Sequence, residues 1–209
     1  MLEDQIKVAK AFWTNQTLYP EYPYIKERRF LEIKYILKHL GDAKSLLDYG
    51  CGDGSMLLLL RELSDLKELY GMDLSDNLIK IAKEKLGGSA YICTYDFNNG
   101  EEIPWDTDIT ISLGVIPYLF EDKKVEQYLS TTLSSKLILR VSCGLEERIS
   151  INKYSDDLKS QYAAVYRTPK EVYQLLDKYF TITDIDRAYP DEIESKYGTK
   201  HFFFVGNRK

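Results

Sequence analysis

The sequence has few cysteines and few histidines, and each shortage excludes a class of protein. The three cysteines, Cys51, Cys93 and Cys143, are odd in number and lack the spacing of metal ligands. We therefore expect neither a disulfide framework nor a metal site. The two histidines, His39 and His201, fall in a predicted helix and at the start of a predicted strand, and neither is an obvious catalytic base.

Long hydrophobic runs are also absent. No apolar segment approaches the roughly 20 residues that span a bilayer, and the N-terminus carries Glu3 and Asp4 without an apolar signal core. We therefore expect a cytoplasmic protein that does not associate with a membrane. The net charge of −5 disfavours a long nucleic acid as partner, because phosphate backbones bind faces rich in Lys and Arg.

Apolar runs of strand length alternate with segments of helical spacing along most of the 209 residues. This alternation predicts one α/β domain, a doubly wound sheet with helices on both faces. The predicted helices cover about residues 27–40, 55–63, 76–86, 122–133 and 169–179, and the predicted strands cover 45–49, 68–72, 90–95, 108–113, 136–142, 180–185 and 201–205.

Residues 46–55 form a glycine-rich turn between a predicted strand and a predicted helix. Glycines occupy positions 50, 52 and 54, so a ligand can lie directly against the backbone. A dinucleotide-binding turn would need a glycine at position 55, where this chain has Ser55. Asp48 and Asp53 border the turn and repel phosphate groups, whereas a positively charged ligand is compatible with them.

Further side chains suited to a nucleoside follow the next predicted strands. Asp73 follows the second strand, where its carboxylate can accept hydrogen bonds from both ribose hydroxyls. After the third strand, Asp96 offers an acceptor for an exocyclic amine and Phe97 an aromatic face for a base. Leu113 ends the fourth strand and begins an apolar wall. Because ligands of open α/β sheets bind beyond the carboxyl ends of the strands, we expect these residues to lie together.

The turn, the acids and the order of elements resemble the class I S-adenosylmethionine-dependent methyltransferases over about residues 28–207. The resemblance implies a seven-stranded, mostly parallel sheet with an antiparallel last strand, S-adenosylmethionine as cofactor and S-adenosylhomocysteine as product. It places Asp48 near the cofactor's amino end, Asp73 on the ribose, Leu74 on the adenine and Asp96 on the adenine amine. The predicted cofactor-binding residues are Asp48, Gly50, Cys51, Gly52, Asp73, Leu74, Asp96, Phe97 and Leu113.

The methyl acceptor is predicted from less specific signals. Family members that methylate base amino groups carry Asn/Asp-Pro-Pro-Tyr/Phe after the fourth strand, and this chain has Leu113-Gly114-Val115-Ile116 there. We predict a small-molecule acceptor, methylated on oxygen: a sugar, a carboxylate or a phosphorylated metabolite. The candidates are Tyr118 and Arg167 for catalysis and Tyr24, Arg28, Arg140 and Tyr166 for binding. Arg140 and Arg167 could together hold an anionic acceptor. The structural alternative is an aromatic wall for Tyr118 and a surface ion pair for each of these two arginines.

The single domain 1–209 is expected to comprise a cofactor-binding core at 28–143, acceptor-side insertions at 144–166 and 189–200, and an N-terminal lid or helix at 1–27. Three alternative functions remain: methylation of a protein or RNA, binding of S-adenosylmethionine or S-adenosylhomocysteine without catalysis, and aminopropyl transfer. Aminopropyl transfer would need acidic residues after the fourth strand. The oligomeric state is left open. The lid is suggested by Trp13, Tyr19, Tyr22 and Tyr24, with Pro20 and Pro23 between them.

Overall fold

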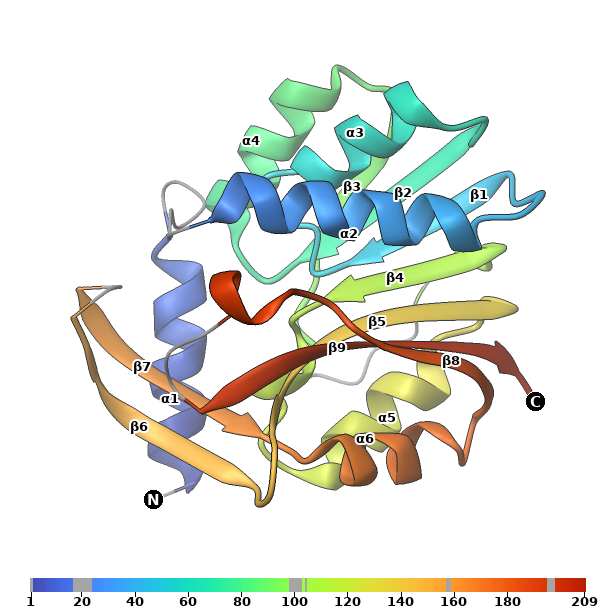
Figure 1. Ribbon diagram of the computed structural model, residues 1–209. Helices are drawn as coiled ribbons and strands as arrows, with labels where there is room; N and C mark the ends of the chain where they lie inside the picture. The colour runs from blue at the N-terminus through green and yellow to red at the C-terminus, as the bar shows by residue number, and fades with distance from the viewer. Residues whose placement is uncertain (1, 17–23, 98–102, 104, 157–158, 195–197) are drawn as a thin grey trace.

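A computed structural model describes residues 2–16, 24–97, 103, 105–156, 159–194 and 198–209. Seven strands form one central sheet in the order β3-β2-β1-β4-β5-β9-β8, and β6 and β7 form a separate hairpin (Figure 1). The helices are α1 (Leu2–Thr14), α2 (Ile25–His39), α3 (Ser55–Leu63), α4 (Asp76–Leu86), η1 (Ile116–Tyr118), α5 (Asp122–Thr131), α6 (Pro169–Leu176) and η2 (Asp191–Ile193). The strands are β1 (Ser45–Tyr49), β2 (Glu68–Asp73), β3 (Tyr91–Thr94), β4 (Ile109–Leu113), β5 (Lys136–Gly144), β6 (Ile149–Ser155), β7 (Ser160–Tyr166), β8 (Phe180–Arg187) and β9 (Thr199–Arg208).

The strand directions confirm the predicted fold class. β1 pairs in parallel with β2 and β4, β2 with β3, and β4 with β5. The last strand, β9, lies antiparallel between β5 and β8. The carboxyl ends of β1 to β5 therefore share one edge of the sheet, which is the edge where the site residues were expected.

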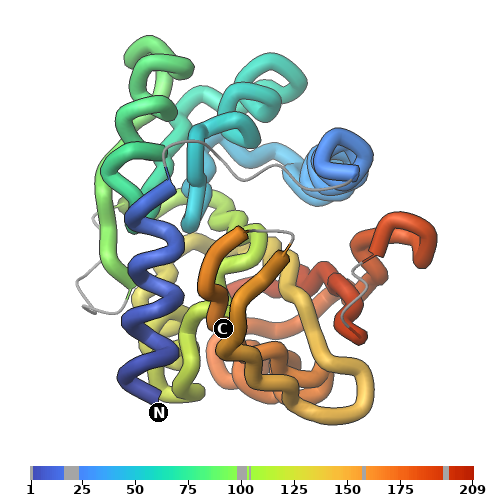
Figure 2. The backbone as a smooth tube through the Cα atoms, turned by 90° about the vertical axis from the view of Figure 1, so that its left-hand side faces the viewer, coloured from blue at the N-terminus to red at the C-terminus, as the bar shows by residue number. Residues whose placement is uncertain are grey.

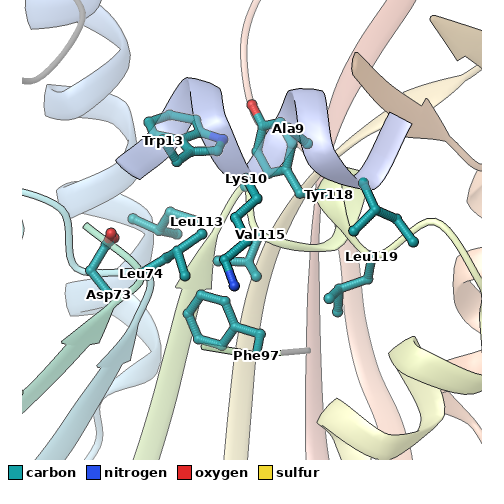
Figure 3. Close-up of a pocket in the computed structure, with 13 residues that line it drawn as sticks. Ala9, Lys10, Trp13, Asp73, Leu74, Phe97, Leu113, Val115, Tyr118 and Leu119 are labelled. Atoms are coloured by element: carbon teal, nitrogen blue, oxygen red, sulfur yellow. The ribbon is translucent and has the colours of Figure 1, made fainter. Parts of the chain in front are cut away.

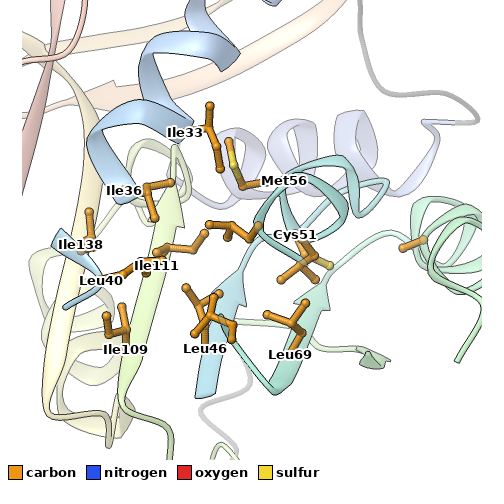
Figure 4. Close-up of a cluster of buried hydrophobic side chains, with 14 of the residues drawn as sticks. Ile33, Ile36, Leu40, Leu46, Cys51, Met56, Leu69, Ile109, Ile111 and Ile138 are labelled. Atoms are coloured by element: carbon orange, nitrogen blue, oxygen red, sulfur yellow. The ribbon is translucent and has the colours of Figure 1, made fainter. Parts of the chain in front are cut away.

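Two hydrophobic clusters cover the two faces of the sheet. Alternate residues of β1 divide between them, with Leu46 in the cluster beneath α2, α3 and α4 and Leu47 in the cluster beneath α5 and α6. Figure 4 shows the first cluster, where Ile36 is fully buried. In the second, the rings of Tyr49 and Tyr128 stack at 4.3 Å. Because both faces are covered, the central strands are apolar on both sides.

The segment expected as a polar insertion at 144–166 contains a regular hairpin. β6 and β7 pair antiparallel from Ile149↔Tyr166 to Ser155↔Ser160. Its inner side is apolar, with Ala163 fully buried. The expected loop at 189–200 is also shorter, since η2 lies within it and β9 already begins at Thr199.

The N-terminal segment contains a helix that packs on the hairpin rather than on the central sheet. Ala9 of α1 shares a small apolar cluster with Phe120, Ala163 and Val165, and Figure 2 shows α1 running alongside the hairpin. Tyr19 and Tyr22 lie outside the described residues. Among the described residues, no helix combines the length and the apolar character needed to cross a membrane.

Candidate functional site

The glycine turn after β1 lies directly against the segment after β4. Gly50 has a φ of 95°, which side-chain-bearing residues rarely adopt. A Cβ atom on Gly50 would lie 2.4 Å from Cγ2 of Val115, closer than atoms can approach. Gly50 and Cys51 both donate backbone hydrogen bonds to the carbonyl of Met72, which ties the turn to β2. Glycine is therefore required at position 50 by conformation and by space.

Asp73, the last residue of β2, is held by backbone groups of two loops. One carboxylate oxygen accepts a hydrogen bond from the amide of Gly52 at 2.9 Å, and the other accepts from the amide of Ser75, also at 2.9 Å. Burial raises the pKa of Asp73, and these backbone donors oppose that effect. Each oxygen keeps a second lone pair, so the carboxylate can still accept from a ribose diol.

A mostly hydrophobic hollow, which we call the apolar cavity, opens beside Asp73 (Figure 3). Its volume is about 70 Å³. α1 crosses it from the side of Asp73 and Leu74 to the side of Tyr118 and Leu119. The cavity is lined by Ile6, Ala9, Lys10, Trp13, Gly50, Asp73, Leu74, Phe97, Leu113, Gly114, Val115, Tyr118 and Leu119.

A second hollow, the polar cavity, lies on the other side of the glycine turn. It has a volume of about 40 Å³ and a largely charged wall. Gly50 and Leu113 line both cavities, so the two hollows meet at the turn. The polar cavity is lined by Ile25, Arg28, Arg29, Glu32, Asp48, Gly50, Cys51, Asp53, Met56, Leu113 and Arg140.

Asp48 is the most strongly perturbed carboxyl group of the polar cavity. It is 2% exposed, and burial raises its pKa to about 8, with further contributions from the charges of Asp73, Glu32 and Asp53. A buried acid among other acids stabilises a cation, since a cation offsets their mutual repulsion. Asp48 therefore suits an ammonium group and disfavours an anion.

The structure compensates the charges of two other predicted acids. Lys85 of α4 forms an ion pair with Asp53, so Asp53 contributes less to the repulsion of phosphate at the turn than its sequence position indicates. Lys10 of α1 pairs with Asp96 at 2.7 Å. Asp96 thus lies beside the apolar cavity with an internal cation already at one of its oxygens.

Burial also raises the pKa of the Cys51 thiol well above its ordinary value. Cys51 is 6% exposed, so it fits the role of a small residue that fills the turn better than that of a reactive thiolate.

Arg167 has contacts that account for its guanidinium without a substrate. It is 1% exposed, and its Nε donates to Asp122 at 2.7 Å. One of its terminal nitrogens donates to the carbonyl of Leu119 at 2.9 Å, and the contacts with Ile116 and Phe120 carbonyls are longer. Arg167 therefore stabilises the segment after β4 through its backbone carbonyls. It does not line the apolar cavity, so it does not contact a ligand there.

Arg140 is also engaged within the protein. Its Nε lies 3.1 Å from a carboxylate oxygen of Glu32, and one terminal nitrogen donates to the carbonyl of Leu113 at 2.8 Å. It lines the polar cavity, next to Asp48, rather than the apolar one. The predicted pair of arginines for an anionic acceptor is therefore not brought together by the fold.

The predicted tyrosines divide between two places. The hydroxyl of Tyr118 lies 3.0 Å from that of Tyr162, which lies 3.1 Å from that of Tyr166. We call these three side chains the phenol row; Figure 3 shows the ring of Tyr118 in the cavity wall with its hydroxyl beyond it. Tyr24, in contrast, is the N-cap of α2 and is 50% exposed.

Arg28 lies in the wall of the polar cavity. It donates two hydrogen bonds to the carbonyl of Ile193 and lies over the ring of Tyr189. The described part of the 189–200 segment therefore packs near α2 and the polar cavity, and it contributes no lining residue to the apolar cavity.

Several lining residues were not predicted from the sequence. Lys10 reads as an ordinary surface lysine, and Arg29 and Glu32 read as the solvent face of a helix. The spacing of Ile6, Ala9 and Trp13 indicates one apolar helix face, but that signal does not say what the face covers. No sequence motif around Tyr162 indicated that its hydroxyl would lie near that of Tyr118.

Comparison with known proteins agrees with this fold and site. Residues 40–195, well over half of the chain, match the family model for a methyltransferase domain. A putative methyltransferase of Geobacillus sp. (strain WCH70) is 31% identical over 125 residues, which are 57% of this chain and 49% of that protein. The chain thus spans about half the length of that relative. The chain belongs to the methyltransferase-domain family and has the fold of class I S-adenosylmethionine-dependent methyltransferases.

Two further similar proteins are more distant in sequence. The carboxy-S-adenosyl-L-methionine synthase of Nautilia profundicola is 24% identical over 162 residues, covering 75% of this chain and 68% of that one. Geranyl diphosphate C-methyltransferase from Streptomyces coelicolor superposes with a TM-score of 0.69 at 12% identity, with 98% of each chain covered. At that identity the superposition speaks for the fold alone.

Proposed function

We propose that this protein binds S-adenosylmethionine and transfers its methyl group to a small molecule. The observation that carries the proposal is the meeting of two unlike cavities at Gly50 and Leu113. An apolar hollow beside Asp73 suits a nucleoside, and a charged hollow beside Asp48 suits an amino acid group. S-adenosylmethionine has both parts, joined at the sulfonium that carries the reactive methyl group.

The roles of the cofactor-site residues follow from this placement. Asp73 holds the ribose, Leu74 and Phe97 contact the adenine, and Asp96 accepts from the adenine amine. In the polar cavity, Asp48 faces the ammonium group. Arg28 or Arg29 faces the carboxylate. Leu113 and Gly50 then lie next to the sulfonium, where the methyl group leaves.

The acceptor site in this proposal lies beneath α1 at the Tyr118 end of the apolar cavity, beside the phenol row, whereas the nucleoside lies at the Asp73 end. Methyl transfer is an in-line displacement, in which alignment and exclusion of water are the main contributions of the protein. A roofed hollow supports a small acceptor over a protein or RNA chain, and the net charge of −5 further disfavours RNA. Two similar proteins bear the names of enzymes with small substrates, a geranyl diphosphate methyltransferase and a carboxy-S-adenosyl-L-methionine synthase.

The phenol row favours an acceptor with a neutral hydroxyl group, because phenols both donate and accept hydrogen bonds. The internal ion pairs of Arg140 and Arg167 leave no corresponding support for a carboxylate or phosphate acceptor. Oxygen methylation of an uncharged compound, such as a sugar, is therefore the reaction that we propose.

Two measurements test this function in order. S-adenosylhomocysteine should raise the melting temperature of the protein, and Asp73→Ala should abolish most of that rise. Asp65→Ala, at an exposed position between α3 and β2, should not. An unchanged melting temperature of the wild-type protein would contradict the cofactor assignment. Release of S-adenosylhomocysteine in a screen of metabolites then separates an enzyme from a non-catalytic binding protein, and turnover with macromolecular fractions alone would contradict the small-molecule acceptor.

A further inference from the structure

α1 forms the roof of the apolar cavity, where the cofactor's nucleoside is proposed to bind. Four of its residues, Ile6, Ala9, Lys10 and Trp13, line the hollow. In Figure 3 the helix crosses directly above Phe97 and the other floor residues. A ligand that lies on this floor is therefore covered by α1.

One side of α1 is fixed to the hairpin by packing. Ala9 is buried against Ala163 and Val165, and the ring of Phe12 lies edge-on to Tyr162 at 5.7 Å. These contacts bury apolar surface and are insensitive to salt. They attach α1 to β7, which lies outside the central sheet.

The other side of α1 is fixed to the cofactor edge of the sheet by a charge. Lys10 Nζ lies 2.7 Å from Oδ2 of Asp96, whose side chain is 12% exposed. Asp96 follows β3 and is the carboxylate proposed to receive the adenine amine. The ion pair therefore closes the roof at the position where the base would bind.

The size of the hollow indicates that this closed arrangement must open. A cavity of about 70 Å³ is less than half of the roughly 150 Å³ cavity that admits benzene. Adenosine is much larger than benzene, so the hollow has to widen before it can hold the nucleoside. α1 is the part of its wall that packs on the hairpin instead of belonging to the central sheet. Movement of α1 away from the sheet separates Lys10 from Asp96.

We propose that α1 is a lid over the cofactor site and that the Lys10–Asp96 ion pair is its latch. The proposal rests on the proposed function, since it takes S-adenosylmethionine or its product as the ligand. A carboxylate oxygen can accept more than one hydrogen bond, so Asp96 can keep Lys10 while it accepts from the adenine amine. The latch therefore holds the lid closed both before and after binding, and its opening precedes both uptake and release.

The test uses Lys10→Met, which keeps the length of the side chain and removes its charge. Lys7→Met, one turn earlier on an exposed part of α1, is the matched control. All proteins carry Trp105→Phe, which leaves Trp13 in the roof as the single tryptophan. Stopped-flow fluorescence with S-adenosylhomocysteine then gives the association and dissociation rates.

We expect Lys10→Met to raise both rates by about fivefold, the effect of losing one partly buried ion pair, with Kd changed by less than about twofold. Lys7→Met should leave both rates unchanged. Higher salt should speed association in the wild-type background and have no such effect on Lys10→Met, because salt screens the pair. Faster dissociation alone would make Lys10 a ligand contact, and unchanged rates would give it no role; either result overturns the latch.

Hydrogen exchange in the absence of ligand separates failure of the latch from failure of the cofactor assignment. Amides of Leu2–Thr14 should exchange about fivefold faster in Lys10→Met than in Lys7→Met, since exchange follows opening. Unchanged exchange overturns the latch whatever the ligand. Faster exchange in a protein that shows no S-adenosylhomocysteine binding overturns the proposed function, and with it the gating of a cofactor.

Discussion

The two cavities that meet at the glycine turn differ in nearly every respect. The apolar cavity is walled by aromatic and aliphatic side chains beneath α1, and the polar cavity by arginines and carboxylates from α2 and the strand ends. Each alone is common in proteins. Their junction at Gly50 is informative, because a ligand that fills both must be largely apolar at one end and charged at the other.

The largest effect on ligand binding is expected from a side chain placed at Gly50, where the two cavities meet. Gly50→Ala should weaken S-adenosylhomocysteine binding by more than about 100-fold, since the new Cβ atom would collide with Val115. Gly41→Ala is the matched control, because Gly41 also has a positive φ, 56°, but nothing lies within 4 Å of its Cβ position. Calorimetry should show normal binding for Gly41→Ala. Comparable binding by both variants would mean that the ligand does not cross the turn.

A second substitution tests whether Arg167 stabilises the protein by supporting the wall of the apolar cavity. Arg167→Met should lower the free energy of unfolding by about 3 kcal/mol, because buried carbonyls and Asp122 lose a charged partner. Arg148→Met is its control, since Arg148 contacts the same Asp122 from a more exposed position, and it should cost less than about 1 kcal/mol. Urea unfolding measures both. A stable Arg167→Met protein that binds cofactor but cannot methylate would restore Arg167 as a catalytic candidate.

Binding in the polar cavity should depend on pH through Asp48. Asp48 has a pKa of about 8, so below that pH it is mostly protonated and cannot pair with an ammonium group. The charges of Asp73, Glu32 and Asp53 contribute to that raised pKa, and Arg28, Arg29 and Arg140 line the same cavity. Affinity for S-adenosylhomocysteine should therefore rise by about tenfold from pH 6 to pH 7, as binding draws the acid into its ionised form.

Asp48→Asn sharpens this test. The variant should bind more weakly at pH 7 and with an affinity that changes little between pH 6 and pH 7. The window stays below the pKa of the ligand's own α-amino group, about 8. A wild-type affinity that is equally flat would show that Asp48 does not face the ammonium group.

The smallest expected effect concerns the phenol row. Tyr162→Phe should change S-adenosylhomocysteine affinity by less than about twofold, because the two hydrogen bonds of its hydroxyl, to Tyr118 and Tyr166, are lost at a residue that lines neither cavity. The same variant should slow methylation of an acceptor found by screening. A large loss of cofactor affinity would instead place the nucleoside against the hairpin, contrary to the division of the two cavities.

Local patterns predicted the sheet well because its elements are locally encoded. The buried runs at β1 and β4 and the helical spacing of α2 fall close to their predicted positions. The strand-end acids Asp48 and Asp73 line the two cavities for the same reason, since parallel strands end at one edge. The single seven-stranded sheet and its antiparallel last strand were predicted from the family resemblance rather than from periodicity.

The hairpin and the roof were harder to predict because their partners are distant in the sequence. Ala9 packs against Ala163, and Lys10 pairs with Asp96, 86 positions away. Arg167 looked like a ligand-binding arginine because a lone charge usually lies at the surface. Its carbonyl partners belong to η1 and the turn that follows it. Every residue has a backbone carbonyl, so a sequence does not show which carbonyls will accept a hydrogen bond from a distant side chain.

The sequence by itself determined the strand–turn–helix frame, the glycines that permit a close approach, and the acids that favour a cationic nucleoside. These features depend on backbone freedom and on charge, which are properties of single residues and their near neighbours. Only the tertiary structure decided that two cavities meet at Gly50, that α1 covers one of them, and that Arg140 and Arg167 are held in internal ion pairs. Those outcomes depend on which distant side chains share a space, and that is set by packing rather than by local pattern.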